Sequence, residues 1–299
     1  MNSKVALVII FNHRYDKNIP LLRKIYSDRF SIIRFIVPFY EGKDDDVYTV
    51  YENSFEFQGY IAQSYDKLKE LECQHYVFIG DDLILNPTIN ENNILSSLRL
   101  NKSDSYIESV TPLKYMKWHY HRFFNASKAF LGEGVNFDSE LPSYESAYKR
   151  VAEYGFGNID INKDMKKIIP DVNGIRGKIK VFLDRTVHPV TVKYPLFTGY
   201  SDFFVIPKEK LYDFSRLCGV FSAMRLFVEI AIPTAMVLVN HKKNLKMQQD
   251  VEVITKKMWC VSDFVMHFEK KCNYRIENMD ENWPINYLYL HPVKLSRWE

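Results

Sequence analysis

The sequence predicts an α/β fold built on a mainly parallel sheet flanked by helices, and three observations lead to this prediction. Short apolar runs alternate with amphipathic stretches through residues 1–90. The runs are rich in β-branched residues and show no polar alternation, a pattern typical of strands covered on both faces. The first run leads into Asn12-His13 and the third into Gly80-Asp81-Asp82, as expected where parallel strands present their carboxyl ends to a ligand.

Residues 1–90 predict two crossover units in chain order. Pro20 stands near the start of the first expected helix, where its missing N–H removes no hydrogen bond. A β-α-β-α-β order with right-handed crossovers makes the strands parallel. The expected elements are the strand Lys4–Phe11, the helix Asn18–Phe30, the strand Ile32–Phe39, the helix Gly59–Leu71 and the strand His75–Ile79.

Residues 91–299 show a less regular pattern. Residues 91–154 suggest a mostly helical insertion, and a strongly apolar helix is expected from Leu226 onward. Runs rich in β-forming residues predict strands at Lys178–Leu183, Val190–Lys193 and Asp202–Pro207. No repeat or linker-like stretch interrupts the chain, so we expect one domain over residues 1–299.

The composition excludes several classes of protein. The chain has 299 residues, 46% of them hydrophobic and 26% charged, which is typical of a globular protein with a substantial core. Its net charge of +3 is too small to favour a nucleic-acid binder. None of the four cysteines belongs to a CxxC pair, so neither a zinc site nor a disulfide framework is expected.

Two apolar runs could be mistaken for targeting or membrane segments. The run Val5–Phe11 lacks a small-residue cleavage site and is better explained as a buried strand. The run Leu226–Val239 contains Glu229 and Pro233 and is too short to cross a bilayer. We therefore expect a cytoplasmic protein, for which a peripheral association with the inner membrane surface stays open.

The strongest local signal is the pair Asp81-Asp82 between apolar runs. Two adjacent carboxylates are costly to bury unless something neutralises them. A divalent cation would do so, because Mg²⁺ and Mn²⁺ prefer oxygen ligands and often combine one or two carboxylates with substrate phosphates. A solvated turn between two strands is the alternative interpretation.

The segment Gly80-Asp81-Asp82 resembles the DXD motif of glycosyltransferases of the GT-A fold, with glycine in place of the first aspartate. In that family the motif follows the third or fourth strand of a Rossmann-like half. The resemblance implies that Asp82 ligates Mg²⁺ or Mn²⁺ and that Asp81 contacts the donor sugar or ribose. It also implies that residues 1–90 are a nucleotide-binding half and residues 91–299 an acceptor-binding half that carries a small antiparallel sheet.

Three later segments resemble further landmarks of the family, in the family's order. They are Phe197–Asp202 for a glycine-containing loop near the acceptor, Phe227-Val228-Glu229 for an acidic position that opens a helix, and Leu290-His291-Pro292 for a late histidine of the metal shell. The resemblance implies a ligand contact at Gly199, a catalytic base at Glu229 and a metal ligand at His291.

These residues also have structural interpretations. Glu229 could be stabilised by the helix dipole or paired with Arg225, although a carboxylate held against apolar neighbours has a raised pKa that suits a general base. Asp202 is the second candidate for the acid–base role, and turn chemistry also explains an aspartate there. His291 before a proline could be a surface histidine.

The resulting hypothesis is a single-displacement transfer of a sugar from a nucleotide-sugar, with a UDP-sugar as the first choice, to a glycan or lipid-linked acceptor, as in bacterial surface-polysaccharide biosynthesis. Phe11, Asn12 and His13 are the expected base or ribose contacts. Glu229 would deprotonate the acceptor hydroxyl in an inverting enzyme, and would bind acceptor or stabilise the charged centre in a retaining one.

Two other functions remain compatible with the sequence. A sugar nucleotidyltransferase also uses paired carboxylates, but the sequence contains neither its basic glycine-rich loop nor a P-loop. A non-catalytic glycan-binding protein would account for the 15% of aromatic residues without bringing Asp82, Glu229 and His291 together.

Overall fold

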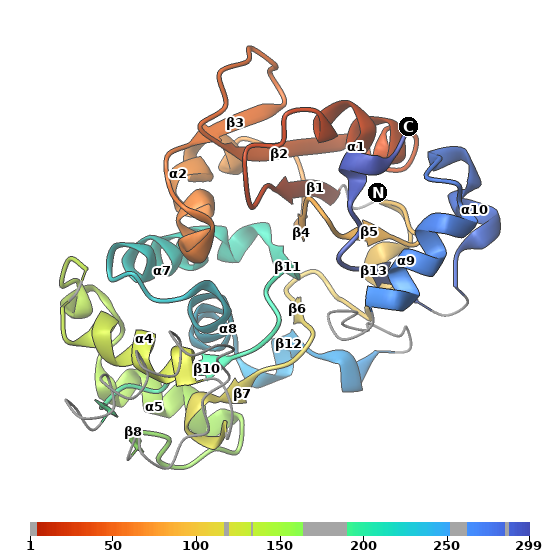
Figure 1. The fold of residues 1–299 in the computed structure, drawn as a ribbon. Helices are drawn as coiled ribbons and strands as arrows, with labels where there is room; N and C mark the ends of the chain where they lie inside the picture. The colour runs from red at the N-terminus through yellow and green to blue at the C-terminus, as the bar shows by residue number, and fades with distance from the viewer. Residues whose placement is uncertain (1–4, 117–119, 133, 164–189, 252–261, 285–286) are drawn as a thin grey trace.

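The computed structural model describes residues 5–116, 120–132, 134–163, 190–251, 262–284 and 287–299. Its centre is a sheet in the order β12-β6-β11-β4-β1-β2-β3 (Figure 1). Neighbouring strands are parallel except at β11, which is antiparallel to both β4 and β6. The strands are β1 (Val5–Ile10), β2 (Ile32–Pro38), β3 (Val47–Val50), β4 (His75–Gly80), β6 (Ser105–Ile107), β11 (Phe203–Pro207) and β12 (Leu245–Lys246).

The first strand shows why the sheet needs cover on both faces. Every residue of β1 is buried, and successive side chains enter different cores. Ala6, Val8 and Ile10 belong to one core, whereas Val5 and its alternate neighbours belong to the other. A strand whose residues are all apolar therefore lies between two helical layers, as the pattern predicted.

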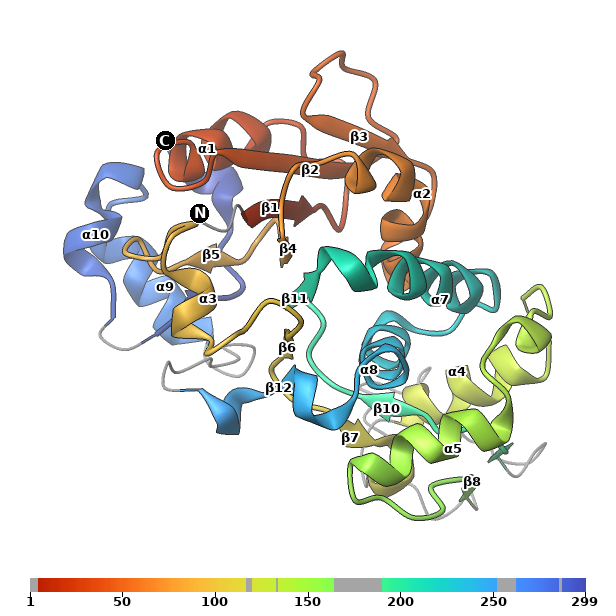
Figure 2. The ribbon, with the colours of Figure 1, turned by 180° about the vertical axis from the view of Figure 1, so that it is seen from behind.

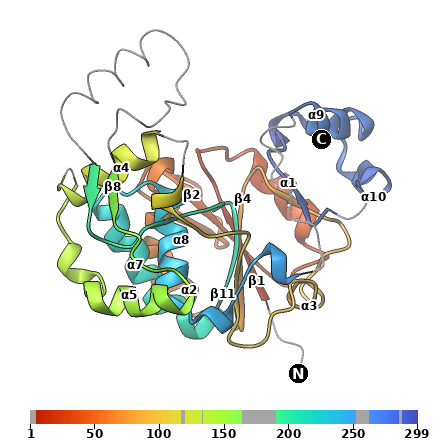
Figure 3. The ribbon, with the colours of Figure 1, turned by 90° about the horizontal axis from the view of Figure 1, so that it is seen from below.

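Helices cover the two faces of the sheet in separate groups, which Figure 3 shows on either side of the strands. Apolar residues of α2 (Gln58–Lys69), α7 (Leu211–Ala223) and α8 (Val228–Val239) pack into the first core. Residues of α1 (Asn18–Tyr26), α3 (Ile94–Ser97), α9 (Ser262–Lys271) and α10 (Met279–Asn282) pack into the second. The helices α4 (Tyr120–Phe130) and α5 (Tyr144–Glu153) lie beyond α8 (Figure 2).

Three two-stranded antiparallel sheets and several 3₁₀ turns complete the described part. The sheets pair β10 (Phe197–Thr198) with β7 (Thr111–Pro112), β8 (Ile161–Lys163) with β9 (Val190–Val192), and β13 (Tyr289–Leu290) with β5 (Ile84–Leu85). The 3₁₀ turns are Ser54–Glu56, Leu113–Tyr115, Asp138–Glu140, Lys208–Lys210, Lys242–Asn244, Gln248–Asp250, Ile276–Asn278 and Leu295–Arg297.

The predicted elements of residues 1–90 are all present, with ends that differ by a few residues. The sequence missed β3, because its four residues follow the acidic stretch Asp44–Asp46, so the strand at His75 is the fourth rather than the third. It also missed α7 and the strand β6, which joins the central sheet from within the supposed helical insertion. The expected strand Lys178–Leu183 lies outside the described residues.

The strand ends meet at one edge of the sheet, as predicted for parallel neighbours. Ile10 at the end of β1 is in register with Ile36 of β2 and with Gly80 of β4. The N–H of Asp81 donates to the carbonyl of Ile10 over 2.9 Å, so the acidic pair begins directly beside the end of β1. Among the described residues, no helix has the length and apolar composition required to cross a bilayer.

Candidate active site at the carboxyl edge of the sheet

The acidic pair lies where β4 leaves the sheet. Asp81 is only 4% exposed, and its Oδ1 accepts a hydrogen bond from the backbone N–H of Asn12 over 3.2 Å. Asp82 is more open, with 31% of its side chain exposed. The two neighbouring carboxylates therefore occupy different environments, one inside the protein and one at its surface.

Burial disfavours the charge of Asp81. Desolvation is the main cause and the nearby Asp82 carboxylate adds to it, and together they raise the pKa of Asp81 to about 8. The hydrogen bond from Asn12 opposes this rise without cancelling it. An added positive charge at this point would stabilise the ionised form of Asp81.

His291 reaches the acidic pair from the far end of the sequence. β13 pairs with β5, with Leu290 opposite Ile84, and the N–H of Val293 donates to the carbonyl of Asp82 over 2.7 Å. These contacts place Nε2 of His291 at 3.1 Å from Oδ1 of Asp82. Two residues that the sequence assigned to one metal ion thus lie side by side, although the chain separates them by 209 positions (291 − 82).

The charge of the His291 ring responds to two opposed influences. Its burial disfavours the imidazolium, but the Asp82 carboxylate, with Asp202 and Asp81 behind it, raises the pKa of His291 above its ordinary value. His291 therefore holds a proton beside Asp82 more firmly than a free imidazole would. A metal ion bound at this pair would have to displace that proton, because only the neutral ring is a ligand.

Asp202 belongs to the same cluster and not to the vicinity of Glu229. It is 9% exposed, and its carbonyl accepts a hydrogen bond from the N–H of Gly80 over 3.0 Å. A side chain at Gly80 would begin 3.3 Å from Oδ1 of Asp82 and 3.7 Å from Cβ of Asp202. A side chain at Gly80 would therefore begin beside the side chains of two carboxylate residues.

A polar pocket of about 500 Å³ opens beside the acidic pair. Asn12 and His13, both expected to contact a ligand, line it together with Asp81 and Asp82. Lys294 and Arg297, in the segment after His291, add two cationic side chains to the same wall. The pocket thus combines carboxylates with cations, a set suited to a bound metal ion and a polyanion.

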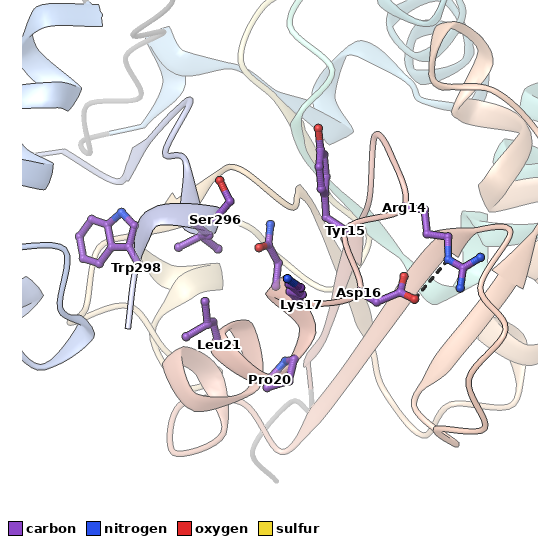
Figure 4. A pocket seen from close by; sticks show the side chains of 10 residues that line it. Arg14, Tyr15, Asp16, Lys17, Pro20, Leu21, Ser296 and Trp298 are labelled. Atoms are coloured by element: carbon purple, nitrogen blue, oxygen red, sulfur yellow. Dashed lines mark hydrogen bonds and ion pairs between the residues drawn. The ribbon is translucent and has the colours of Figure 1, made fainter.

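A second pocket of about 760 Å³ continues the first, because the two share Tyr15, Asn18, Leu295 and Ser296. Figure 4 shows it between the start of α1 and the C-terminal segment, with the Trp298 ring on one side and Asp16 and Arg14 on the other. Apolar groups form most of its lining. Within the described part of the chain, two buried atoms of these residues have no hydrogen-bond partner, Nε1 of Trp298 and Oδ1 of Asp16.

Phe11 differs from the expectation that it contacts a base or ribose. Its side chain is fully buried and meets Phe35 edge to face, with ring centroids 6.2 Å apart. The ring belongs to the core because β1 continues its alternation for one more residue past the strand. The pocket-lining residues of this loop therefore begin at Asn12.

Glu229 lies in the first turn of α8 and lines neither of the two pockets. It is not held by apolar neighbours alone, nor paired with Arg225, because its carboxylate forms an ion pair with Arg122 of α4. Arg122 also donates to the hydroxyl of Thr198 over 2.7 Å. The guanidinium stabilises the ionised form of Glu229, with 22% of the Glu229 side chain still exposed.

Gly199 lines neither of the two pockets described above. Its N–H donates to the carbonyl of Glu229 over 3.1 Å, and a side chain there would begin 2.2 Å from the carbonyl oxygen of Ser109. Glycine is therefore required for close backbone packing at this point, and the structure places Gly199 beside Glu229 rather than in the two pockets at the acidic pair.

One aromatic residue connects the two groups of candidate residues. Tyr200 follows Gly199, stacks on Tyr289 at 5.9 Å and meets the His291 ring edge to face at 5.7 Å. The segment from Gly199 to Asp202 thus runs from the Glu229–Arg122 pair to the Asp82–His291 pair.

The residues at Asp82 fit a divalent cation that shares its coordination with a ligand. Within the described ranges, no three His, Cys, Asp or Glu side chains form a group able to hold a metal ion by themselves. One carboxylate and one imidazole do lie within 3.1 Å of each other, and Mn²⁺ accepts both donor types. A cation here would need phosphate or water oxygens to complete its shell.

The sequence missed several residues of this site. Lys294, Arg297 and Trp298 carry no motif, and tertiary contacts such as the β5–β13 pairing and the Val293–Asp82 hydrogen bond bring them to this edge. Arg122 was missed because its partner Glu229 lies 107 positions away (229 − 122). No family model matches the chain, and a search of curated proteins also gave no match.

Proposed function

We propose that the protein is a metal-assisted glycosyltransferase that uses a nucleotide-sugar donor. The observation that carries the proposal is the meeting of Asp82 and His291, 3.1 Å apart, at the carboxyl edge of a mainly parallel sheet. Open α/β sheets bind ligands at this edge. A pair of ligands from opposite ends of the chain, beside a pocket lined by cations, suits a nucleotide diphosphate held together with a cation.

The two joined pockets give the donor an orientation. The polar pocket at Asp81 and Asp82 suits the diphosphate and sugar, because Lys294 and Arg297 bring positive charge to it. The mostly apolar pocket at Trp298 suits the nucleoside. A nucleobase carries both N–H donors and ring acceptors, and therefore offers partners to Oδ1 of Asp16 and Nε1 of Trp298.

The chain's own residues divide the chemistry between them. Asp82 and His291 would hold a Mn²⁺ or Mg²⁺ ion, which when bound stabilises negative charge on a leaving diphosphate. Lys294 and Arg297, which line the same pocket, add charge stabilisation. Asp81, held at the edge by the N–H of Asn12 and only 4% exposed, lines the polar pocket beside Asp82.

Glu229 and Arg122 form the acceptor side of the proposed site. In an inverting reaction Glu229 accepts the proton of the acceptor hydroxyl, and its ion pair with Arg122 keeps it ionised for that step. In a retaining reaction the same pair binds acceptor hydroxyls instead. The acceptor itself is a glycan or a lipid-linked glycan.

Titration calorimetry with UDP, GDP, CDP and dTDP, each with Mn²⁺ or with EDTA, tests the proposal. We expect one diphosphate to bind in the presence of Mn²⁺ and to lose most of its affinity in EDTA. Failure of all four to bind under both conditions would refute the proposed function. Incubation with sugar 1-phosphate and the four nucleoside triphosphates separates the nucleotidyltransferase alternative, because only that enzyme would release pyrophosphate.

A further inference from the structure

Four aromatic side chains, which we call the aromatic row, line the carboxyl edge beyond the donor pockets. They are Phe39 after β2, Tyr51 after β3, Phe55 before α2 and Phe227 before α8. Phe39, Tyr51 and Phe55 are 54%, 70% and 67% exposed, respectively. Isolated exposed aromatic residues are normal on protein surfaces, but several at a ligand-binding edge require an explanation.

The rings are held on fixed backbone and not on a loose loop. The N–H of Phe39 donates to the carbonyl of Val50 over 2.9 Å, and that of Tyr51 to Oε1 of Gln63 over 2.8 Å. The N–H of Phe55 donates to Oδ1 of Asn53 over 2.9 Å. These hydrogen bonds fix the backbone from which the rings of Phe39, Tyr51 and Phe55 project.

The ring arrangement leaves aromatic faces open to a ligand. Phe39 and Tyr51 meet edge to face at 5.8 Å, and Phe55 lies tilted against Phe227 at 6.2 Å. Phe39 has a φ of 54°, in the left-handed region that bulky residues rarely adopt. Such conformations gather at functional sites, and here the conformation directs an apolar ring outward from the strand end.

The charges around the row distinguish between possible occupants. Glu52 and Glu56 directly follow Tyr51 and Phe55, whereas Glu41, two residues after Phe39, forms an ion pair with Arg14. Carboxylates repel the phosphate of a lipid carrier but accept hydrogen bonds from sugar hydroxyls. An aromatic face next to carboxylates thus suits a neutral sugar ring, whose C–H bonds lie on the negative face of the aromatic ring.

We propose that the aromatic row binds the neutral glycan portion of the acceptor. One end of the row, Phe227, stands two residues before Glu229, so a glycan along the row lies next to the Glu229–Arg122 pair. This inference rests on the proposed function, since it assigns the row to the acceptor of that reaction.

The test uses an array of immobilised neutral, acidic and phosphorylated oligosaccharides, together with vesicles containing polyprenyl phosphate. The wild-type protein should bind neutral oligosaccharides, with affinities that Tyr51→Ala and Phe55→Ala each weaken roughly 3- to 10-fold, the range expected for one aromatic stacking contact. Phe137→Ala is the matched control, because Phe137 is 40% exposed but lies by the groove between α2 and α7. Unchanged melting temperatures will show that all three variants are folded.

Two results would overturn the inference. One is wild-type binding to none of the neutral oligosaccharides, and the other is equal binding by the row variants and the wild type. Binding of polyprenyl phosphate vesicles through Tyr51 and Phe55 in place of neutral glycans would also reject it. A parallel titration with the nucleoside diphosphates and Mn²⁺ keeps the two proposals separate. The row variants should bind the nucleotide like the wild type. If the proposed function is wrong, neither the wild type nor any variant will bind a nucleoside diphosphate.

Discussion

Replacing Asp81 by Asn should stabilise the protein in the absence of divalent cations, even though the change removes a residue of the candidate site. The native fold raises the pKa of Asp81 from 3.8 to about 8 because its carboxyl group is buried beside Asp82. Between these values the folded protein holds a proton that the unfolded chain releases. Stability is therefore highest at low pH and falls as the pH rises from about 4 to about 8.

The size of the effect follows from that interval. At pH 7 the folded protein retains the proton about three pH units above the unfolded pKa, which corresponds to on the order of 4 kcal/mol of lost stability at about 1.4 kcal/mol per unit. A carboxamide nearly matches the protonated carboxyl group in shape and can still accept the N–H of Asn12. For a protein of this size, 4 kcal/mol corresponds to an increase of roughly 10 °C in melting temperature.

Urea denaturation in EDTA at pH 5, 6, 7 and 8 measures the difference between Asp81→Asn and the wild type. The gain should grow with pH by about 1.4 kcal/mol per unit. Asp45→Asn is the control, because Asp45 is exposed and its replacement should give no such slope. Two results would show that the fold does not disfavour the ionised form of Asp81. One is a variant no more stable than the wild type at pH 7, and the other is a gain in stability that does not depend on pH.

Four further changes test other parts of the site. The affinity for Mn²⁺ in the presence of nucleoside diphosphate should rise from pH 6 to pH 8, because the raised pKa of His291 makes protons compete with the ion. In calorimetry, His291→Ala should reduce this slope and leave the part that the ionisation of Asp81 contributes. If Glu229 is the general base, Glu229→Gln should lower turnover by about 10²–10⁴-fold and leave nucleotide affinity unchanged. Near-normal turnover would assign the role of general base to another residue. Gly199→Ala should destabilise the fold by about 1–3 kcal/mol or more in thermal melts, since its Cβ would begin 2.2 Å from a backbone carbonyl oxygen. Trp298→Phe should weaken nucleoside diphosphate binding by about 2- to 12-fold, the effect of losing one hydrogen bond, and leave pyrophosphate binding unchanged. An equal loss of affinity for both ligands would exclude a contact between Trp298 and the base.

The sequence predicted those features of the fold that local patterns determine. The strands at Val5 and Ile32 and the helix at Gln58 could be found because continuous apolar runs and amphipathic periods reflect burial directly. The strand β3 could not, because four residues after an acidic stretch carry too little signal, and β6 could not, because three residues do not distinguish a strand from a turn.

The candidate site was predictable only where it has a motif. Asp81 and Asp82 stand out as adjacent carboxylates between apolar runs, and His291 was placed by its order relative to them. Arg122 and Trp298 were not predictable, because an arginine or tryptophan acquires a role only through contacts formed by the tertiary fold. The burial of Phe11 was likewise hidden, since the sequence does not show where a strand's alternation ends.

The pairing of β13 with β5 has a consequence for folding. Loop closure over more than 200 residues costs entropy that only the surrounding contacts recover, so this pairing should form late. Until it forms, Asp82 lacks His291, and the pockets lack their wall of residues 293–298. A chain that has assembled only β1 through β4 would display a sheet edge with two carboxylates and little affinity for a nucleotide. Donor binding would therefore report that folding is complete, and it would shift the equilibrium toward the docked form of residues 287–299 by mass action.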